Sequence, residues 1–393
     1  MLMVLTSAFA LSQAFRTVAS IMAEPLRAEF GFGAQGLGLF AGAFHFAFGA
    51  LQLFMGIGID LHGVRRTVLA VFPLAIAGSA MSAMAPDAHW LLFGQILIGI
   101  GCAPAFLVCT VFIGRHFASG RFAAVSAITM AVGSVGMLAT GTPLAWLVAH
   151  VSWRAGFVAL AAGSALSWLA IFRLVREPER ASGAGMPPRP GVMDALRGCA
   201  ALIRMPHTPG ILALSAVTYA AFLSLRGLWL APLLIARHDF SLVQSGHVAL
   251  ALSALGMLGL PLFGALDPGP ARRRATILAF TLASAALFAG MAFGLGAVFD
   301  VVASIAIGVL SGFIVLQYAD VKAAYPAAMT GRAMALFTMA MFLGVALMQW
   351  TTGLFAAVAA AHGVELHAAA MGLIAVLLVA AALAFRLLPA PPR

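Results

Sequence analysis

Charged side chains are scarce in this chain. Asp, Glu, Lys and Arg make up only 9% of its 393 residues, whereas 63% are hydrophobic, and the mean hydropathy is +1.05. Such a composition excludes a soluble globular domain. A membrane crossing takes about 20 apolar residues, so the chain has room for roughly a dozen membrane helices and little else. Because backbone groups in lipid must bond internally, and because no alternating barrel strands are evident, we predict an all-α membrane protein.

Cysteine is also rare, and the common signatures of metal, nucleotide and secreted proteins are missing. Cys102, Cys109 and Cys199 have no metal-binding spacing and imply no disulfide framework. No Walker loop is found, which argues against an ATP-driven pump. The N-terminus has neither the basic region nor the cleavage site of a signal peptide, so we interpret it as the first span. We expect no enzyme activity, no cofactor and no metal.

Twelve apolar runs are present, six on each side of a stretch that is rich in charge, proline and glycine. The predicted spans are residues 3–23, 35–57, 67–85, 91–113, 124–149, 156–174, 209–234, 246–266, 275–298, 301–321, 333–357 and 368–388. The stretch between them predicts a cytoplasmic linker, with a short helix near Val192–Ile203. We therefore predict an N-terminal six-helix bundle (1–174), a linker (175–207) and a C-terminal six-helix bundle (208–393).

Lys and Arg are distributed unevenly between alternate loops. If the N-terminus is inside, 17 of these residues lie on the inner side, and only Arg27, Arg154 and Arg237 lie outside. This asymmetry follows the positive-inside rule and predicts that both termini are cytoplasmic. The net charge of +10 is then a matter of membrane topology rather than of nucleic-acid binding. We expect a monomer in a bacterial inner membrane.

The two halves repeat each other. Three equivalent pairs have nearly equal separations: Asp60 and Asp267 lie 207 residues apart, Arg16 and Arg226 lie 210 apart, and Gly120 and Gly331 lie 211 apart. The agreement indicates one six-helix unit used twice, as parallel repeats about an axis along the membrane normal.

The segment Gly56–Arg66, with the sequence GIGIDLHGVRR, resembles the signature between the second and third spans of the major facilitator superfamily. The six-plus-six layout, the weaker copy at Gly264–Arg274 and the pair Trp153-Arg154 extend the resemblance over nearly the whole chain. It implies two bundles that rock around a central cavity at the membrane midplane. It also implies a charge latch at the gates, formed by Asp60, Arg65, Arg66, Asp267 and Arg272.

Two departures from the superfamily's patterns concern the fourth and fifth spans. Many proton-coupled members have an arginine in the fourth span where this chain has Gln95, and the fifth-span motif of drug antiporters is only partly matched, by Gly133, Gly136, Gly141 and Pro143. Both departures argue against a proton/drug antiporter.

Arg16 and Arg226 are the two basic residues predicted to lie within spans. An arginine at bilayer depth costs roughly 2.5–3.5 kcal/mol on insertion scales. Spans one and seven border the central cavity in this superfamily, and a pair of arginines there resembles the organophosphate:phosphate antiporters and related anion transporters. Two guanidinium forks can bind phosphate or carboxylate oxygens from both bundles. The alternative is that each arginine bonds backbone carbonyls and only fixes helix packing.

Other polar residues extend this candidate site. Gln13 shares a helix face with Arg16, and Tyr219 lies seven residues before Arg226, two turns along the same face. Gln349 is a buried polar candidate, for which a hydrogen bond between helices is the alternative. Tyr219 could instead be an aromatic packing residue. His45, in the middle of span two, either carries a coupling proton or is a neutral histidine that donates to a neighbouring helix.

The twelve carboxylates are informative because none is predicted at mid-span. They are Glu24, Glu29, Asp60, Asp87, Glu177, Glu179, Asp194, Asp239, Asp267, Asp300, Asp320 and Glu365. Exporters of cations and drugs generally use a membrane carboxylate to balance charge. We therefore predict a secondary transporter of a small organic anion, as a proton symporter or an anion exchanger. The alternatives are a proton-coupled exporter of drugs or amphipathic metabolites, and a sensor or assembly factor that does not transport.

Overall fold

The computed structural model describes residues 1–117, 119–176, 192–326 and 329–391, and within these ranges it contains helices and no strand. Ten helices or helix pairs in this part of the chain are long and apolar enough to cross a membrane. Two further pairs, Leu2–Phe30 and Ala34–Ile59, pass the same test but bend by 44° and 40°. If each bent pair is one span the total is twelve, as predicted.

The first half of the molecule, residues 2–174, contains eleven helical segments in the described residues. They are α1 (Leu2–Phe15), α2 (Val18–Phe30), α3 (Ala34–Ala50), α4 (Gln52–His62), α5 (Val64–Val71), α6 (Pro73–Ala83), α7 (Ala88–Cys102), α8 (Ala105–His116), α9 (Ser119–Ala139), α10 (Thr142–His150) and α11 (Trp153–Leu174).

The second half, residues 208–387, follows a helix at the predicted position in the linker, α12 (Val192–Ile203). Its segments are α13 (Thr208–Ser224), the π-helical turn η1 (Leu225–Trp229), α14 (Leu230–His238), α15 (Leu242–Ala265), α16 (Pro270–Ala292), α17 (Ala297–Leu310), the 3₁₀ turn η2 (Ser311–Phe313), α18 (Ile314–Ala324), α19 (Thr330–Ala361) and α20 (Leu366–Leu387).

Several spans are interrupted where proline or glycine disturbs the helix. Pro73 begins α6, Pro104 precedes α8, and Gly141 precedes α10, whose second residue is Pro143. Proline lacks the N–H that an uninterrupted helix needs, and kinks concentrate at such positions. These interrupted spans therefore each consist of two shorter helices, and the breaks between them lie inside the protein.

Side-chain caps fix four helix starts at the end of the bundle opposite the termini. The Asp87 carboxylate accepts hydrogen bonds from two backbone N–H groups of α7, and Glu365 does the same for α20. Ser152 caps α11, and Ser241 forms a reciprocal capping box with Gln244 at the start of α15. These caps satisfy N–H groups that a helix start otherwise leaves unpaired.

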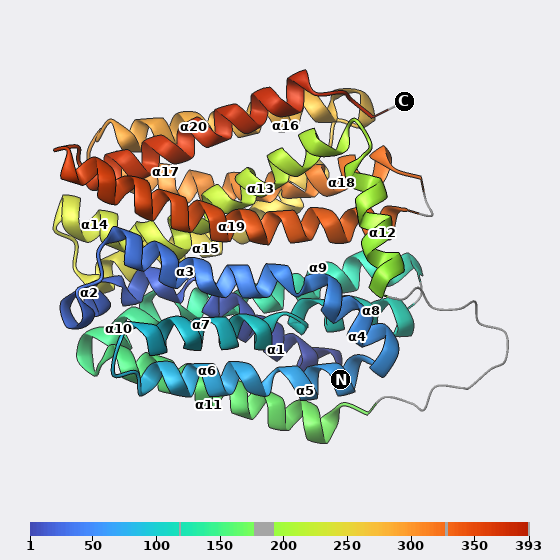
Figure 1. Cartoon of the computed structure of the whole chain (residues 1–393), viewed down its shortest axis with the longest axis horizontal. Helices are drawn as coiled ribbons and strands as arrows, with labels where there is room; N and C mark the ends of the chain where they lie inside the picture. Colours follow the sequence, from blue (N-terminus) through green and yellow to red (C-terminus); the bar gives the residue numbers. More distant parts are fainter. Residues whose placement is uncertain (118, 177–191, 327–328, 392–393) are drawn as a thin grey trace.

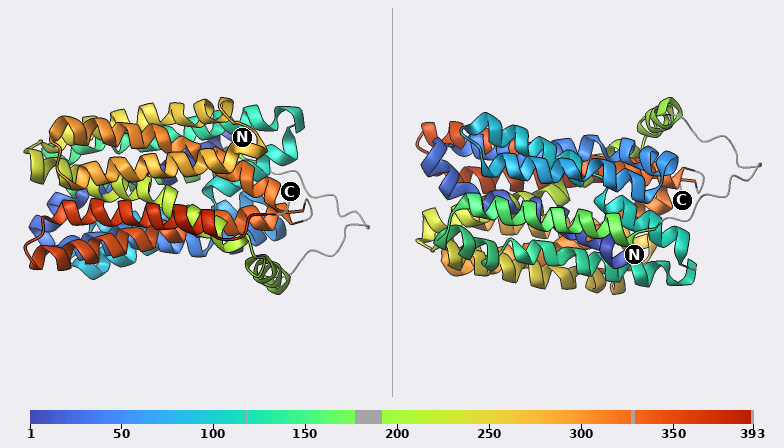
Figure 2. Two further views of the ribbon diagram at one scale, coloured as in Figure 1. Left: turned by 90° about the horizontal axis from the view of Figure 1, so that it is seen from above. Right: turned by 90° about the horizontal axis from the view of Figure 1, so that it is seen from below.

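The two halves occupy opposite sides of the molecule in Figure 1, with α1–α11 below and α13–α20 above. Figure 2 shows α12 apart from the long helices, at the end of the bundle where both termini lie. The halves meet along two seams, α3 with α19, and α9 and α10 with α15. A Cβ atom at Gly38 of α3 would overlap the carbonyl oxygen of Gln349 in α19, so only small residues permit this approach.

Candidate functional site

Arg16 and Arg226 both lie where a helix is irregular. Arg16 follows the last residue of α1, and the chain bends by 44° between α1 and α2. Arg226 lies within η1, the π-helical turn of span seven. The two irregular segments touch, since a Cβ atom at Gly227 would lie 2.8 Å from the carbonyl oxygen of Arg16. Broken membrane helices and π-turns are frequent at binding sites, so this crossing is the candidate site.

The Arg16 guanidinium packs against two aromatic rings that also contact each other. Its Cζ atom is 4.6 Å from the ring centroid of Phe48 in α3 and 4.7 Å from that of Phe342 in α19. The two rings come from opposite halves, and their centroids are 4.5 Å apart. Arg16 is only 5% exposed, and its Nε atom has no hydrogen-bond partner in the described part of the chain. The rings stabilise the positive charge but leave a buried donor unpaired.

The groups that interact electrostatically with Arg16 are all neutral or weakly acidic. They are Tyr219, Cys102, Tyr318 and His45, and no carboxylate of the described residues is among them. A buried charge is normally paired, because removing it from water without a partner is costly. The Arg16 site is therefore electropositive and lacks a protein counter-ion within the described chain.

Arg226 has a different environment and is 0% exposed. Its Nε donates to Ser253 Oγ of α15 at 2.9 Å, and its Nη2 donates to the Met137 carbonyl at 2.9 Å and to Thr140 Oγ1 at 3.3 Å. Met137 is near the C-terminal end of α9, where carbonyls lack intrahelical partners and a cation is favoured. Two of the three donor nitrogens of Arg226 are thus occupied, whereas Nη1 is unpaired.

The two arginines therefore do not share one set of neighbours in this conformation. Arg16 contacts α3 and α19, whereas Arg226 contacts α9 and α15, which form the other seam between the halves. Both side chains are buried, so neither faces an open cavity here. Both residues are buried inside the protein, but the structure does not place them side by side around one ligand.

Three further predicted site residues have unpaired polar atoms. Gln13 is 8% exposed with an unpaired Oε1, and Gln349 is fully buried with both amide atoms unpaired, within the described chain. His45 is 1% exposed and interacts electrostatically with Arg16. Unpaired buried polar atoms are rare in native proteins, and a cluster of them indicates a place for water or a ligand.

One nitrogen of His45 has a defined role. Nδ1 lies 3.1 Å from the carbonyl oxygen of Ala41, one helical turn earlier, and therefore must donate a proton to it. In the neutral imidazole Nε2 is then an acceptor, and it has no partner among the described residues.

Tyr219 lies on the Arg16 side rather than near Arg226. Its ring centroid is 5.7 Å from that of Phe342, and its hydroxyl interacts with Arg16. The predicted shared face of Tyr219 and Arg226 is thus wrong. The prediction assumed a regular α-helix, whereas the π-helical turn η1 changes the angular position of the residues that follow its start.

A family comparison agrees with this architecture. The sequence model described as Major Facilitator Superfamily matches residues 4–349. The chain belongs to the Major Facilitator Superfamily. It is accordingly a multi-pass membrane transporter and not an enzyme. No curated protein matches its sequence.

Solved structures of other superfamily members have the same fold. A bacterial homologue of the human lysosomal transporter Spinster, in an inward-facing and unoccupied conformation, gives a TM-score of 0.79 at 18% identity, covering 98% of this chain and 95% of that one. A D-xylose–proton symporter gives 0.74 at 14% identity (99% and 98% covered), and a mutant of the nucleoside transporter NupG gives 0.76 at 15% (98% and 98%). At these identities the likeness establishes the fold alone.

The superfamily signature segment in the first half is only partly described. The side chain of Asp60 lies outside what the structure describes. Arg65 Nη2 donates to the carbonyl oxygen of Phe172 in α11 at 2.8 Å, and its Cζ is 5.6 Å from the Phe172 ring centroid. Arg66 is exposed. In this conformation Arg65 therefore contacts another helix of its own half.

The copy of this signature in the second half forms a defined ion pair, although with a different arginine from the one predicted. Arg273, not Arg272, donates to both carboxylate oxygens of Asp267, at 3.1 and 2.6 Å, while Arg272 is exposed. The Arg273 guanidinium holds the pKa of Asp267 below its usual value. Consecutive helical residues point about 100° apart, so only one arginine of the run can face the loop that carries Asp267.

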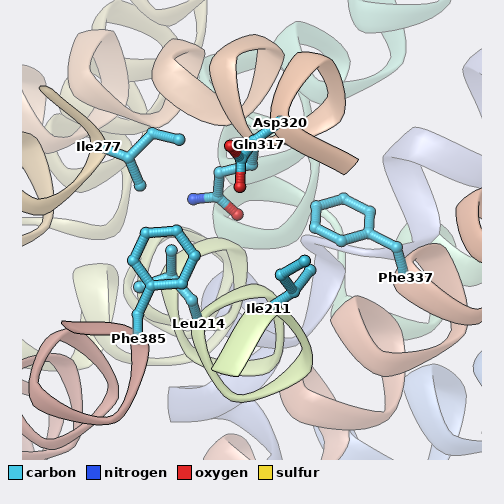
Figure 3. A pocket seen from close by; sticks show the side chains of 7 residues that line it. All are labelled: Ile211, Leu214, Ile277, Gln317, Asp320, Phe337 and Phe385. Carbon is cyan, nitrogen blue, oxygen red and sulfur yellow. The ribbon is translucent and has the colours of Figure 1, made fainter. Parts of the chain in front are cut away.

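A small cavity lies close to this ion pair, between helices of the second half (Figure 3). Its volume is about 10 Å³, and it is lined by Ile211, Leu214, Ile277, Gln317, Asp320, Phe337 and Phe385. This volume holds at most one water molecule. Asp320 at its edge is 3.5 Å from Arg274. The cavity is too small for a substrate and is a packing defect, mostly apolar in its lining, within the second half.

Several residues of the two arginine environments were not predicted, and these include Met137, whose carbonyl accepts from Arg226. Thr140 directly precedes Gly141, where the helix breaks, and the glycine in the sequence could have marked this position as a candidate contact. Phe48 lies one turn after His45 on the same helix, which also could have been noticed. Nothing in the sequence distinguishes Phe342 or Ser253 from the many similar residues in their spans.

Proposed function

We propose that this chain is a secondary transporter that moves a small organic anion by alternating access, with Arg16 as the main charged group that binds it. The observation that carries this proposal is the environment of Arg16. This buried guanidinium has an unpaired Nε and no carboxylate neighbour in the described chain. Its hydrogen-bonding capacity is therefore satisfied only when an anion or a water molecule binds beside it.

Around Arg16 the other proposed substrate contacts are Gln13, His45, Tyr219 and Gln349. The Tyr219 hydroxyl and the side-chain amides of Gln13 and Gln349 are able to donate to an anion held by the guanidinium, whereas His45 does so only after its Nε2 takes up a proton. Arg226 joins this set only if its side chain leaves Met137 and Thr140. A site with one available guanidinium and aromatic walls suits a carboxylate on an apolar body better than a phosphate ester, which carries more charge.

His45 is the proposed proton carrier if transport is proton symport. Its Nε2 is the free acceptor, and a proton taken up there would be lost again when the anion leaves Arg16. The alternative coupling is anion exchange, in which the loaded carrier rearranges faster than the empty one. We place the protein in a bacterial inner membrane with both termini cytoplasmic, in accordance with the asymmetry of Lys and Arg.

The test is ligand-induced thermal stabilisation of the purified protein by acetate, benzoate, succinate, gluconate and glycerol 3-phosphate, with uptake into proteoliposomes for any anion that stabilises. A ligand of the native state must raise apparent stability. We expect benzoate to act more strongly than glycerol 3-phosphate, and Arg16→Ala to abolish the effect. If no anion acts, or if Arg16→Ala responds as the wild type does, Arg16 is structural and an exporter is the better interpretation.

A further inference from the structure

A buried chain of hydrogen bonds connects four spans beside the candidate site. Thr17 Oγ1, at the break between α1 and α2, lies 2.6 Å from Thr140 Oγ1, and both hydroxyls are 0–1% exposed. Thr140 accepts from Arg226 Nη2 at 3.3 Å, and Arg226 Nε donates to Ser253 at 2.9 Å. The chain thus runs from the residue after Arg16, through Thr140, to Arg226.

This chain crosses between the halves at Thr140 and Arg226. Thr17, Thr140 and Met137 belong to the first half, and Arg226 belongs to the second. Two of the three hydrogen bonds of Arg226, those to Thr140 and to the Met137 carbonyl, therefore cross the seam between α9 and α15. The seam is tight here, since a Cβ atom at Gly141 would lie 2.9 Å from Leu250 Cβ. Separation of the halves at this seam requires both bonds to break.

We propose that Arg226, Thr140 and the Met137 carbonyl form a latch that keeps this seam closed in the empty carrier, and that the substrate anion releases it by attracting Arg226. This inference rests on the proposed function for the second step only. An ionised carboxylate is a stronger acceptor for a guanidinium than a hydroxyl or an amide carbonyl. The contact between Gly227 and the Arg16 carbonyl places the latch next to the anion site. A ligand that binds better to the unlatched state shifts the population toward it.

The first experiment measures the latch without any ligand. Spin labels at positions 150 and 247, which are exposed and lie on α10 and α15 beside this seam, report its width by pulsed electron resonance. Cys199 is replaced by alanine, whereas Cys102 and Cys109 are buried and remain. We expect Thr140→Val to shift a measurable fraction of the empty protein to longer distances. Thr140→Ser, which keeps the hydroxyl, should resemble the wild type.

Thr129→Val is the matched control. Thr129 is a buried threonine of α9, the helix that Thr140 follows, and within the described residues its hydroxyl donates to the Val125 carbonyl of its own helix, at 2.9 Å. We expect its distance distribution to equal that of the wild type. The latch is overturned if Thr140→Val leaves the distribution unchanged, if Thr129→Val widens the seam equally, or if Thr140→Ser behaves as Thr140→Val does.

The second experiment adds benzoate to the labelled wild type and to Thr140→Val. We expect benzoate to widen the seam in the wild type and to add less in Thr140→Val, where one of the two bonds is absent and a fraction of the empty protein is already open. If benzoate stabilises the protein but leaves the seam unchanged, the release step is overturned while the proposed function stands. If Thr140→Val opens the empty protein and no anion of the panel binds, the anion-driven release falls together with the proposed function, whereas the latch itself is supported.

Discussion

The two arginine environments occupy equivalent places in the two halves, yet their chemistry differs. Arg16 of span one lies between span two and span eleven, and Arg226 of span seven lies between span eight and span five. Arg16 packs against two aromatic rings and has an unpaired Nε, whereas Arg226 donates to two hydroxyls and a carbonyl and, within the described chain, has only its Nη1 unpaired. Arginines at equivalent positions therefore need not have the same function, because the neighbouring spans decide whether each guanidinium is available to a ligand.

The largest expected effect is on anion binding. Arg16→Ala removes charge-assisted hydrogen bonds that together contribute about 3 kcal/mol, so affinity for a stabilising anion should fall by roughly 100-fold or more. Arg226→Ala should reduce affinity much less. Calorimetric titration or thermal-shift titration measures both. Equal losses in the two variants would show that the sites act as one.

The next effect is on the stability of the empty protein, and it should differ in sign between the two sites. Arg226→Met removes the three hydrogen bonds to Ser253, Thr140 and the Met137 carbonyl, although the carbonyl still accepts from Thr140 Oγ1, and should cost about 2–4 kcal/mol. Arg16→Met removes an unpaired buried charge and should be neutral or stabilising. Apparent melting temperatures in detergent without anion test this. A similar loss of melting temperature in both variants would show that the two arginines contribute equally to stability.

The aromatic rings should have an intermediate effect. Phe342→Leu removes one of the two ring faces at Arg16, which is expected to lower the stability of the empty protein by about 1 kcal/mol. In an Arg16→Met background the same change should cost less, since the cation is gone. A double-mutant cycle on melting temperatures measures this coupling. A cycle without coupling would mean that the ring only fills space.

The smallest effect concerns the ion pair of the second half and the choice between adjacent arginines. Because the folded pKa of Asp267 lies below its unfolded value, the pair stabilises above about pH 4 and its contribution is lost as the pH falls through the folded pKa. Asp267→Asn should therefore lower the melting temperature at pH 7 and converge with the wild type below pH 4.

Arg273→Gln should reproduce the effect of Asp267→Asn at pH 7, whereas Arg272→Gln, at an exposed position, should be nearly silent. Melting curves of the three variants recorded side by side provide the comparison. If Arg272→Gln destabilises more than Arg273→Gln does, the observed pairing is not the important one.

The interior of the molecule shows where prediction from sequence reached its limit. The apolar runs predicted the twelve spans and the linker helix, since length and hydropathy alone define a crossing. They also placed Arg16 and Arg226 at buried positions. The face of Tyr219 was predicted wrongly, because η1 breaks the regular helical periodicity that the prediction assumed. Arg272 was chosen over Arg273 because a run of three arginines does not reveal which one faces back toward the loop.

Composition and hydropathy were enough to predict the membrane class, the approximate spans and the positions of Arg16 and Arg226 within apolar runs, because a crossing is defined by its length and apolarity. Only the tertiary structure decided what surrounds each charge. Phe342 and Thr140 approach Arg16 and Arg226 from the opposite half of the molecule, 326 and 86 residues away along the chain. Contacts between distant spans depend on helix breaks and close packing at glycines, and neither the partner nor its orientation can be read from local periodicity.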